Sequence, residues 1–156
     1  MSDEPTPGPV TLSMTVLMTP DMSNFSGNVH GGALLRLLDQ VAYACGSQYA
    51  SSYVVTLSVD RVLFRGPIRV GELVTFTASV NYTGRTSMEV GIRVDAKEII
   101  TGVTRHVNSC YFTMVAVDGD GHPHPIPALL PGTDATRKRY ADAQRRRKAA
   151  REAVAE

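Results

Sequence analysis

The chain has 156 residues and a formal net charge of +1. This length suits one domain whose hydrophobic core is large enough to be stable without disulfides or a structural metal. Its two cysteines, Cys45 and Cys110, lie in apolar patterns and lack the spacing of metal ligands. These features exclude a disulfide scaffold, and we expect reduced core thiols in a cytoplasmic protein. No apolar stretch approaches membrane-spanning length, and the acidic, proline-rich start differs from a signal peptide, so we expect no membrane partner.

The first part of the chain predicts a disordered start over residues 1–9, a strand over 10–18, a loop over 20–27 and a helix from about 31 to 47. Leucine, valine, alanine and cysteine cover a broad arc of this helix, which is typical of a buried helix face.

The hydrophobic period then changes to two, which predicts strands. The run at 53–64 has a slip in its alternation at Asp60 and Arg61 that suggests a bulge. Residues 73–82 and 87–96 alternate cleanly and are joined by a glycine turn, so we expect a hairpin. Residues 103–117 carry apolar side chains on both faces, as a central strand does. The order favours an α+β fold, with one antiparallel sheet wrapped around one helix.

Positive charge is concentrated in the tail. Residues 1–132 carry 8 basic and 11 acidic side chains, whereas residues 133–156 carry 8 basic and 4 acidic ones. Alanine and arginine in the tail predict a helix, but large apolar residues are almost absent. No aromatic residues are interleaved with the basic run at 145–148, so we expect no nucleic-acid partner. A solvated helix that frays or packs on a neighbouring subunit is favoured.

The segment at 24–40 reads N-F-S-G-N-V-H-G-G-A-L-L-R-L-L-D-Q and is the best candidate for chemistry. Gly31 and Gly32 would lie in the first turn of the helix, where free N–H groups and the helix dipole can hold an oxyanion. Asp39 falls on nearly the same helix face as Gly32, roughly 10 Å further along the axis. The alternative is that Asp39 is a surface acid paired with Arg36.

Four segments together resemble the hotdog-fold acyl-CoA thioesterases, specifically the cytosolic (brain-type) acyl-CoA hydrolase family and its single-domain bacterial relatives. They are S-N-F-S-G-N-V-H-G-G-A-L-L-R-L-L-D-Q-V-A, S-V-D-R-V-L-F-R-G-P-I-R-V-G-E-L-V, T-G-R-T-S-M-E-V and Y-F-T-M-V-A-V-D-G-D-G-H-P-H-P-I-P. The resemblance runs from about residue 11 to 131. It implies a hotdog domain over 10–131 and a basic helical extension over 132–156. It also implies a homo-oligomer that is at least a dimer and, as is common in the family, a hexamer built as a trimer of dimers.

The resemblance also implies a site shared between two hotdog units, with Asn24 from one and Asp39 from the other. Asp39 would activate water or attack the carbonyl directly, Asn24 would orient water or substrate, and Gly32 would stabilise the oxyanion. The products would be a free fatty acid and coenzyme A. We interpret Asn28 as a loop or N-cap residue and His30 as a residue that orders the loop.

Coenzyme A needs basic side chains and exposed backbone. Arg65 matches a basic position of the family, and Arg61 is a weaker candidate. The glycine turn is suited to phosphate or pantetheine contacts; it consists of Gly84, Arg85, Thr86 and Ser87. Each arginine could equally be an ordinary solvated charge. We expect no cofactor, since coenzyme A is part of the substrate and product.

We expect no metal site. The nearest candidate is the turn with Asp118, Asp120, His122 and His124, and it lacks the final glutamate of a calcium-binding loop. A non-enzymatic acyl-CoA sensor remains the alternative function. A hotdog dehydratase is disfavoured because no histidine accompanies Asp39 on the helix.

Overall fold

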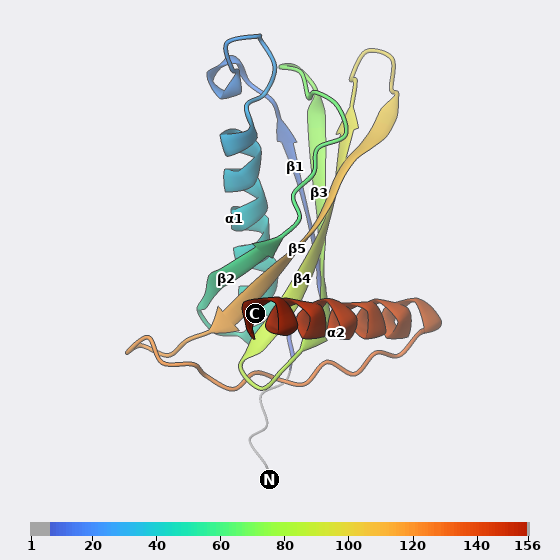
Figure 1. Cartoon of the computed structure of the whole chain (residues 1–156). Helices are drawn as coiled ribbons and strands as arrows, with labels where there is room; N and C mark the ends of the chain where they lie inside the picture. Colours follow the sequence, from blue (N-terminus) through green and yellow to red (C-terminus); the bar gives the residue numbers. More distant parts are fainter. Residues whose placement is uncertain (1–6, 156) are drawn as a thin grey trace.

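In the computed structural model, which describes residues 7–155, a five-stranded antiparallel sheet curls around one long helix, and a second helix lies on the outer face of the sheet (Figure 1). The elements are β1 (Thr11–Leu17), the short 3-10 helix η1 (Pro20–Met22), α1 (Gly31–Ala50), β2 (Val54–Asp60), β3 (Leu73–Thr83), β4 (Ser87–Lys97), β5 (Thr104–Ala116) and α2 (Asp134–Ala155). The strand order is β1-β3-β4-β5-β2, and all neighbouring strands are antiparallel. The predicted α+β hotdog architecture is confirmed.

Most of the predicted disordered start, residues 1–9, lies outside the described residues. Gly8 is described and is ordered, because its N–H donates to the Tyr49 carbonyl at 2.9 Å. A Cβ at this position would lie 1.8 Å from the carbonyl oxygen of Gln48, so the close approach of these two backbones requires glycine. Gly8 is therefore held against the end of α1.

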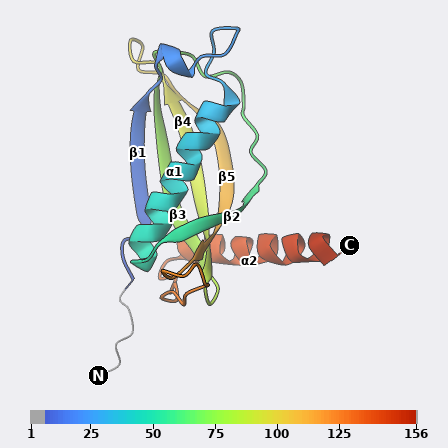
Figure 2. The ribbon, with the colours of Figure 1, turned by 90° about the vertical axis from the view of Figure 1, so that its left-hand side faces the viewer.

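The core lies between α1 and the concave face of the sheet. Side chains three and four residues apart on α1 point inward and are almost fully buried, as expected for an amphipathic helix; they include Leu34, Leu38, Val41, Ala42, Cys45 and Tyr49. Alternate side chains of β3, β4 and β5 meet them. Figure 2 shows α1 lying across this face of the sheet, with α2 emerging from behind it. The predicted helix is confirmed and runs three residues further, to Ala50.

The predicted bulge at Asp60 and Arg61 is wrong in position. The register of β2 against β5 shifts between Thr56 and Ser58, so Leu57 is the extra residue. At Arg61 the chain leaves the strand with a left-handed φ of 46°, which ends the pairing. The broken alternation in the sequence therefore marked the end of the strand rather than a bulge within it.

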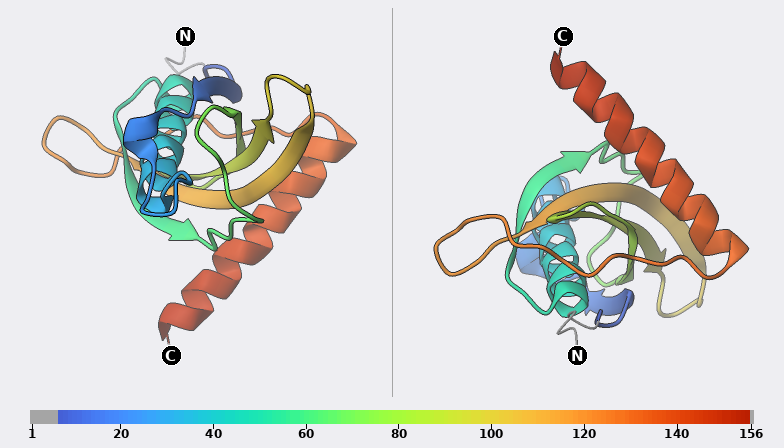
Figure 3. Two further views of the ribbon diagram at one scale, coloured as in Figure 1. Left: turned by 90° about the horizontal axis from the view of Figure 1, so that it is seen from above. Right: turned by 90° about the horizontal axis from the view of Figure 1, so that it is seen from below.

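The tail forms α2, as predicted, and most of its residues are exposed, but the sequence did not predict that the helix also packs on its own sheet. The helix packs on the outer face of its own sheet, where Ala143 is fully buried. The Arg146 guanidinium donates to both Glu89 carboxylate oxygens, at 3.0 and 2.6 Å, and lies 3.6 Å from the Tyr111 ring centre. Buried aromatic and ionic contacts thus replace the missing large apolar residues. The C-terminal part of α2 extends well past the sheet (Figure 3).

Candidate active site

Asp39 lies on the exposed side of α1 and is held by a residue of the neighbouring strand. The Thr56 hydroxyl, on β2, donates to Asp39 Oδ1 at 2.6 Å. This short bond to a carboxylate fixes the Asp39 rotamer and leaves its second oxygen free. Among the ion pairs of residues 7–155 none joins Asp39 to Arg36. The alternative in which Asp39 is a surface acid paired with Arg36 is therefore not supported. Asp39 is an oriented carboxylate.

Apolar side chains surround this carboxylate. Leu35 and Tyr43 lie one helical turn to either side of Asp39, and each is 43% exposed. The Tyr43 ring makes an edge contact with Tyr53, with 5.7 Å between ring centres. Leu57, beside Thr56 on β2, is 68% exposed. Exposed apolar side chains therefore lie on both elements that hold this carboxylate, and such exposed apolar surface often marks a binding or protein-contact site.

Asn24 organises the loop that precedes α1. Its Oδ1 accepts hydrogen bonds from the Ser26 N–H at 2.9 Å, the Ser26 hydroxyl at 2.8 Å and the Asn28 N–H at 3.1 Å. Its own N–H donates to the Asn28 carbonyl at 2.6 Å. Within residues 7–155 the side-chain NH₂ of Asn24 makes no hydrogen bond, so it can donate to a ligand. Asn28 shapes this turn, as expected.

The N-terminus of α1 is capped by His30. Its Nδ1 accepts the Ala33 N–H at 3.1 Å, and its own N–H donates to the Met22 carbonyl at 2.9 Å. The reading of His30 as an ordering residue is therefore confirmed, whereas the N-cap alternative for Asn28 is wrong. The N–H groups of Gly31 and Gly32 donate to no acceptor among the described residues. They form an open donor pair at the positive end of the helix.

The two arginines predicted to meet coenzyme A lie on the extended segment between β2 and β3. Arg65 is exposed and is anchored through its N–H, which donates to the Val107 carbonyl at 2.8 Å. Arg61 is exposed at the end of β2. Neither side chain forms an ion pair with any residue in the described range 7–155. Both guanidinium groups are available to an anionic ligand.

The predicted glycine turn lies at the end of the sheet where α1 ends, whereas Gly31 and Gly32 begin α1 at the other end (Figure 1). Ser87 is buried, and its hydroxyl accepts a hydrogen bond from Arg147 of α2 at 2.7 Å. Arg85 is exposed. Within one chain, this turn, with Gly84 and Thr86, therefore lies at the opposite end of α1 from the open N–H groups of Gly31 and Gly32.

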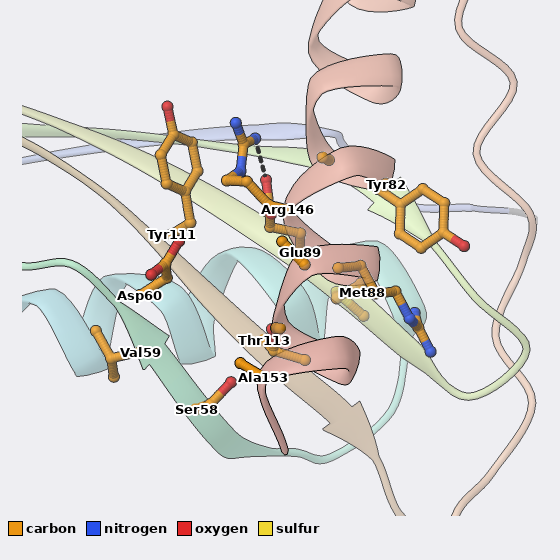
Figure 4. A pocket seen from close by; sticks show the side chains of 14 residues that line it. Ser58, Val59, Asp60, Tyr82, Met88, Glu89, Tyr111, Thr113, Arg146 and Ala153 are labelled. Atoms are coloured by element: carbon orange, nitrogen blue, oxygen red, sulfur yellow. Dashed lines mark hydrogen bonds and ion pairs between the residues drawn. The ribbon is translucent and has the colours of Figure 1, made fainter. Parts of the chain in front are cut away.

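A hollow of about 420 Å³ lies between α2 and the outer face of the sheet (Figure 4). Tyr82, Tyr111 and Arg146 line it, and the bond from Arg146 to Glu89 crosses its wall. None of the predicted site residues lines this hollow. It is the seam along which α2 packs, and it lies on the opposite face of the sheet from α1.

Three side chains of the turn after β5 come close together, namely Asp118, Asp120 and His122. All three are exposed. The Asp118 carboxylate accepts hydrogen bonds from the N–H groups of Asp120 and His122 at 2.9 and 3.0 Å. These bonds stabilise the backbone of the turn. Asp118 thus shapes a turn.

Both thiols are inert. Cys45 and Cys110 are fully buried, and burial raises the pKa of each to about 12. A thiolate nucleophile is therefore absent from the chemistry of residues 7–155. No helix in that range is both long and apolar enough to cross a membrane.

The model of the thioesterase superfamily matches residues 26–103, half of the chain. The chain belongs to this superfamily. It is 51% identical to the protein VdlD of Helicobacter pylori over 136 residues, which cover 87% of this chain and 78% of that protein.

Solved structures of other superfamily members are closely similar. An apo-hexameric acyl-CoA thioesterase superposes with a TM-score of 0.88 at 34% identity and covers 93% of both chains. An acyl-CoA hydrolase from Staphylococcus aureus, solved with butyryl-CoA, CoA and CoA disulfide, has a TM-score of 0.83 at 29% identity and covers 92% of this chain and 90% of its own. Three single variants of the same hydrolase have also been solved, in which alanine replaces an aspartate, an asparagine or a threonine. The resemblance seen in the sequence is confirmed.

Proposed function

We propose that this member of the superfamily hydrolyses acyl-CoA thioesters to a free fatty acid and coenzyme A. The observation that carries the proposal is the Asp39 carboxylate, oriented by Thr56 and set within exposed apolar side chains that suit an acyl chain. The similarity to acyl-CoA thioesterases over nine-tenths of the chain supports the same reaction.

In the proposed reaction, Asp39 removes a proton from water while the water oxygen attacks the thioester carbonyl. The negative charge that develops on the carbonyl oxygen is held by the Gly32 N–H, with Gly31 beside it. Collapse of the tetrahedral intermediate breaks the carbon–sulfur bond, and the proton on Asp39 passes to the departing thiolate. Neither a metal nor a cofactor enters this scheme. Direct attack by Asp39, through an anhydride, is the second candidate and uses the same carboxylate.

The role of Thr56 was not anticipated from the sequence. In the S. aureus hydrolase the substituted asparagine and aspartate are 15 residues apart, and the aspartate and threonine are 17 apart. Asn24, Asp39 and Thr56 have the same spacings. This agreement supports all three as members of one site, with Thr56 orienting the base and Asn24 orienting water or substrate through its free NH₂.

The site needs a second copy of the chain. Strand β2 is an edge of the sheet, and its apolar side chains Val55, Leu57 and Val59 are 37%, 68% and 42% exposed. An apolar edge strand of this length invites pairing with another strand. A partner there would cover the patch around Asp39, exclude water and bring its own Asn24 loop. We infer a dimer at least and, from the hexameric thioesterase, a hexamer built as a trimer of dimers.

Arg65 and Arg61 are the proposed contacts for the phosphates of coenzyme A, because both are exposed and lack ion-pair partners within residues 7–155. The glycine turn, with its exposed Arg85, lies at the end of the sheet where α1 ends, opposite the open N–H groups of Gly31 and Gly32. We propose that it reaches coenzyme A only across a subunit boundary. The reducing cytoplasm suits two free thiols and is the proposed compartment.

The test is free-thiol release from acyl-CoAs of short, medium and long chain, with the purified protein, Asp39→Ala and Arg36→Ala. We expect hydrolysis of at least one substrate, a loss of roughly a hundredfold or more for Asp39→Ala, and little change for Arg36→Ala. Equal losses in both variants would make Asp39 a structural acid. A wild-type protein that binds acyl-CoA without hydrolysing it would favour the sensor alternative.

A further inference from the structure

A second ionic cluster lies at the end of the sheet where α1 begins, and neither of its side chains is one of the proposed catalytic groups. The Glu72 side chain is 8% exposed and forms an ion pair with Arg105 of β5. Arg105 donates to Glu72 Oε1 at 2.5 Å and to Oε2 at 3.0 Å. Guanidinium groups that bind both oxygens of a carboxylate hold it in one orientation. The mechanism proposed above does not use this pair.

The pair closes a turn over residues 67–72. Glu72 Oε2 accepts the Arg69 N–H at 2.9 Å, and Arg105 Nη2 donates to the Pro67 carbonyl at 2.6 Å. Ile68 lies between these two anchored residues and is 2% exposed. The ion pair therefore fixes the orientation of the peptide groups on either side of Ile68.

This turn holds both ends of the segment that carries Asn24. At the start, the Met18 N–H donates to the Glu72 carbonyl at 2.9 Å, and the Gly71 N–H donates to the Met18 carbonyl at 2.8 Å. At the end, the Val29 N–H donates to the Ile68 carbonyl at 2.8 Å. Residues 19–28, with the Asn24 loop, span these anchors, and the His30 cap follows directly.

We propose that Glu72 and Arg105 are positioning residues, which set the Asn24 loop and the first turn of α1 for catalysis through the turn at 67–72. The inference rests on the proposed function. One N–H group and one carbonyl of this turn, those of Arg69 and Pro67, are bound by the pair, so its loss would let the loop shift relative to α1. Displacements of about 1 Å at a distance from the reacting atoms can lower rates by roughly a hundredfold.

The structure offers a matched control in a second buried ion pair. Glu89 is 8% exposed and is bound by Arg146, but this pair joins α2 to the outer face of the sheet and does not contact the 67–72 turn. Glu72→Gln and Glu89→Gln remove the same charge from two buried pairs. A loss of stability alone would appear in both variants.

The experiment compares kcat and KM for thiol release in the wild type, Glu72→Gln, Arg105→Lys and Glu89→Gln, at temperatures where each is folded. We expect kcat to fall by roughly 10- to 100-fold in Glu72→Gln, with KM within about threefold. Arg105→Lys keeps the charge but cannot hold Glu72 and the Pro67 carbonyl together, so we expect a smaller loss. Glu89→Gln is expected to keep the wild-type kcat.

Amide hydrogen exchange supplies a readout that does not depend on activity. We expect the Val29 and Met18 N–H groups to lose protection in Glu72→Gln and to keep it in Glu89→Gln. Unchanged kcat and unchanged exchange in Glu72→Gln would overturn the positioning role, and so would equal losses of kcat in both variants. An inactive wild type with faster exchange in Glu72→Gln would overturn the proposed function. It would still support the inference that Glu72 and Arg105 hold the Asn24 loop in place.

Discussion

The hydroxyl of Thr56 fixes the orientation of the Asp39 side chain, which neither helix geometry nor charge could fix. On an isolated helix, an exposed aspartate samples several rotamers, and its hydrogen bonds are made with water. The 2.6 Å bond from β2 selects one rotamer and leaves one oxygen for a water molecule. A general base needs this fixed geometry more than it needs a shifted pKa.

Loss of the Thr56 hydroxyl should therefore impair catalysis without unfolding the protein. We expect Thr56→Val to lower kcat by roughly 10-fold or more, because a hydrogen bond to a charged group is worth about 1.5–3 kcal/mol. Thr56→Ser keeps the hydroxyl and should recover much of the rate. Steady-state kinetics with Ser58→Ala, a hydroxyl loss on the same strand, provides the control. A fully active Thr56→Val would remove Thr56 from the site.

At the scale of elements, the sequence predicted whatever depends on periodicity within one segment. The apolar spacing of α1 and the alternation of β3 and β4 placed these elements within a few residues, because local side-chain direction follows from backbone period. The contact between Asp39 and Thr56 joins two elements, and it could not be predicted without the position of the Leu57 bulge. A bulge shifts which side chains face the helix, and the sequence pattern put it in the wrong place.

The tail illustrates the same limit. Its composition correctly predicted a helix, but its partner was missed because alanine and arginine do not resemble a packing face. Arg146 packs by lying on the Tyr111 ring and binding Glu89, and both partners come from distant strands. The signal available in the sequence was the alternation of β4, which places Glu89 on the face away from the core, where a basic helix can bind it.

The turn at 67–72 predicts a pH-dependent stability. Arg105 and, more weakly, Arg69 hold the pKa of Glu72 below its usual range, against the effect of burial, and Glu98 is the other charge near Arg105. A lowered pKa in the folded state contributes stability above the unfolded pKa of about 4.3 and loses it as pH falls through the folded value.

We therefore expect the wild type to exceed Glu72→Gln in unfolding free energy at pH 7 by about 1–2 kcal/mol, a modest gap because Arg105 is 39% exposed. Denaturant titrations between pH 7 and pH 3 should show the gap closing below about pH 4. A gap that stays constant over this range would mean that the charge of Glu72 contributes nothing to folding.

At the scale of the whole molecule, one chain carries half of each proposed site. Asp39 is bound by Thr56 of the unpaired edge strand β2, which carries exposed apolar side chains, whereas the Asn24 loop and the free N–H groups of Gly31 and Gly32 lie at the start of α1. Burial against a second copy of the chain would explain both the exposed apolar side chains of β2 and the exposed carboxylate of Asp39. The fold thus predicts that hydrolysis depends on assembly.

The most direct measurement mixes two defective chains. Asn24→Ala and Asp39→Ala are co-expressed, and thiol release is compared with that of each variant alone. If each site combines Asn24 of one chain with Asp39 of its partner, half of the dimers are mixed and each has one intact site, so we expect about a quarter of the wild-type activity. Co-expressed protein that is no more active than the separate variants would contradict a site shared between protomers.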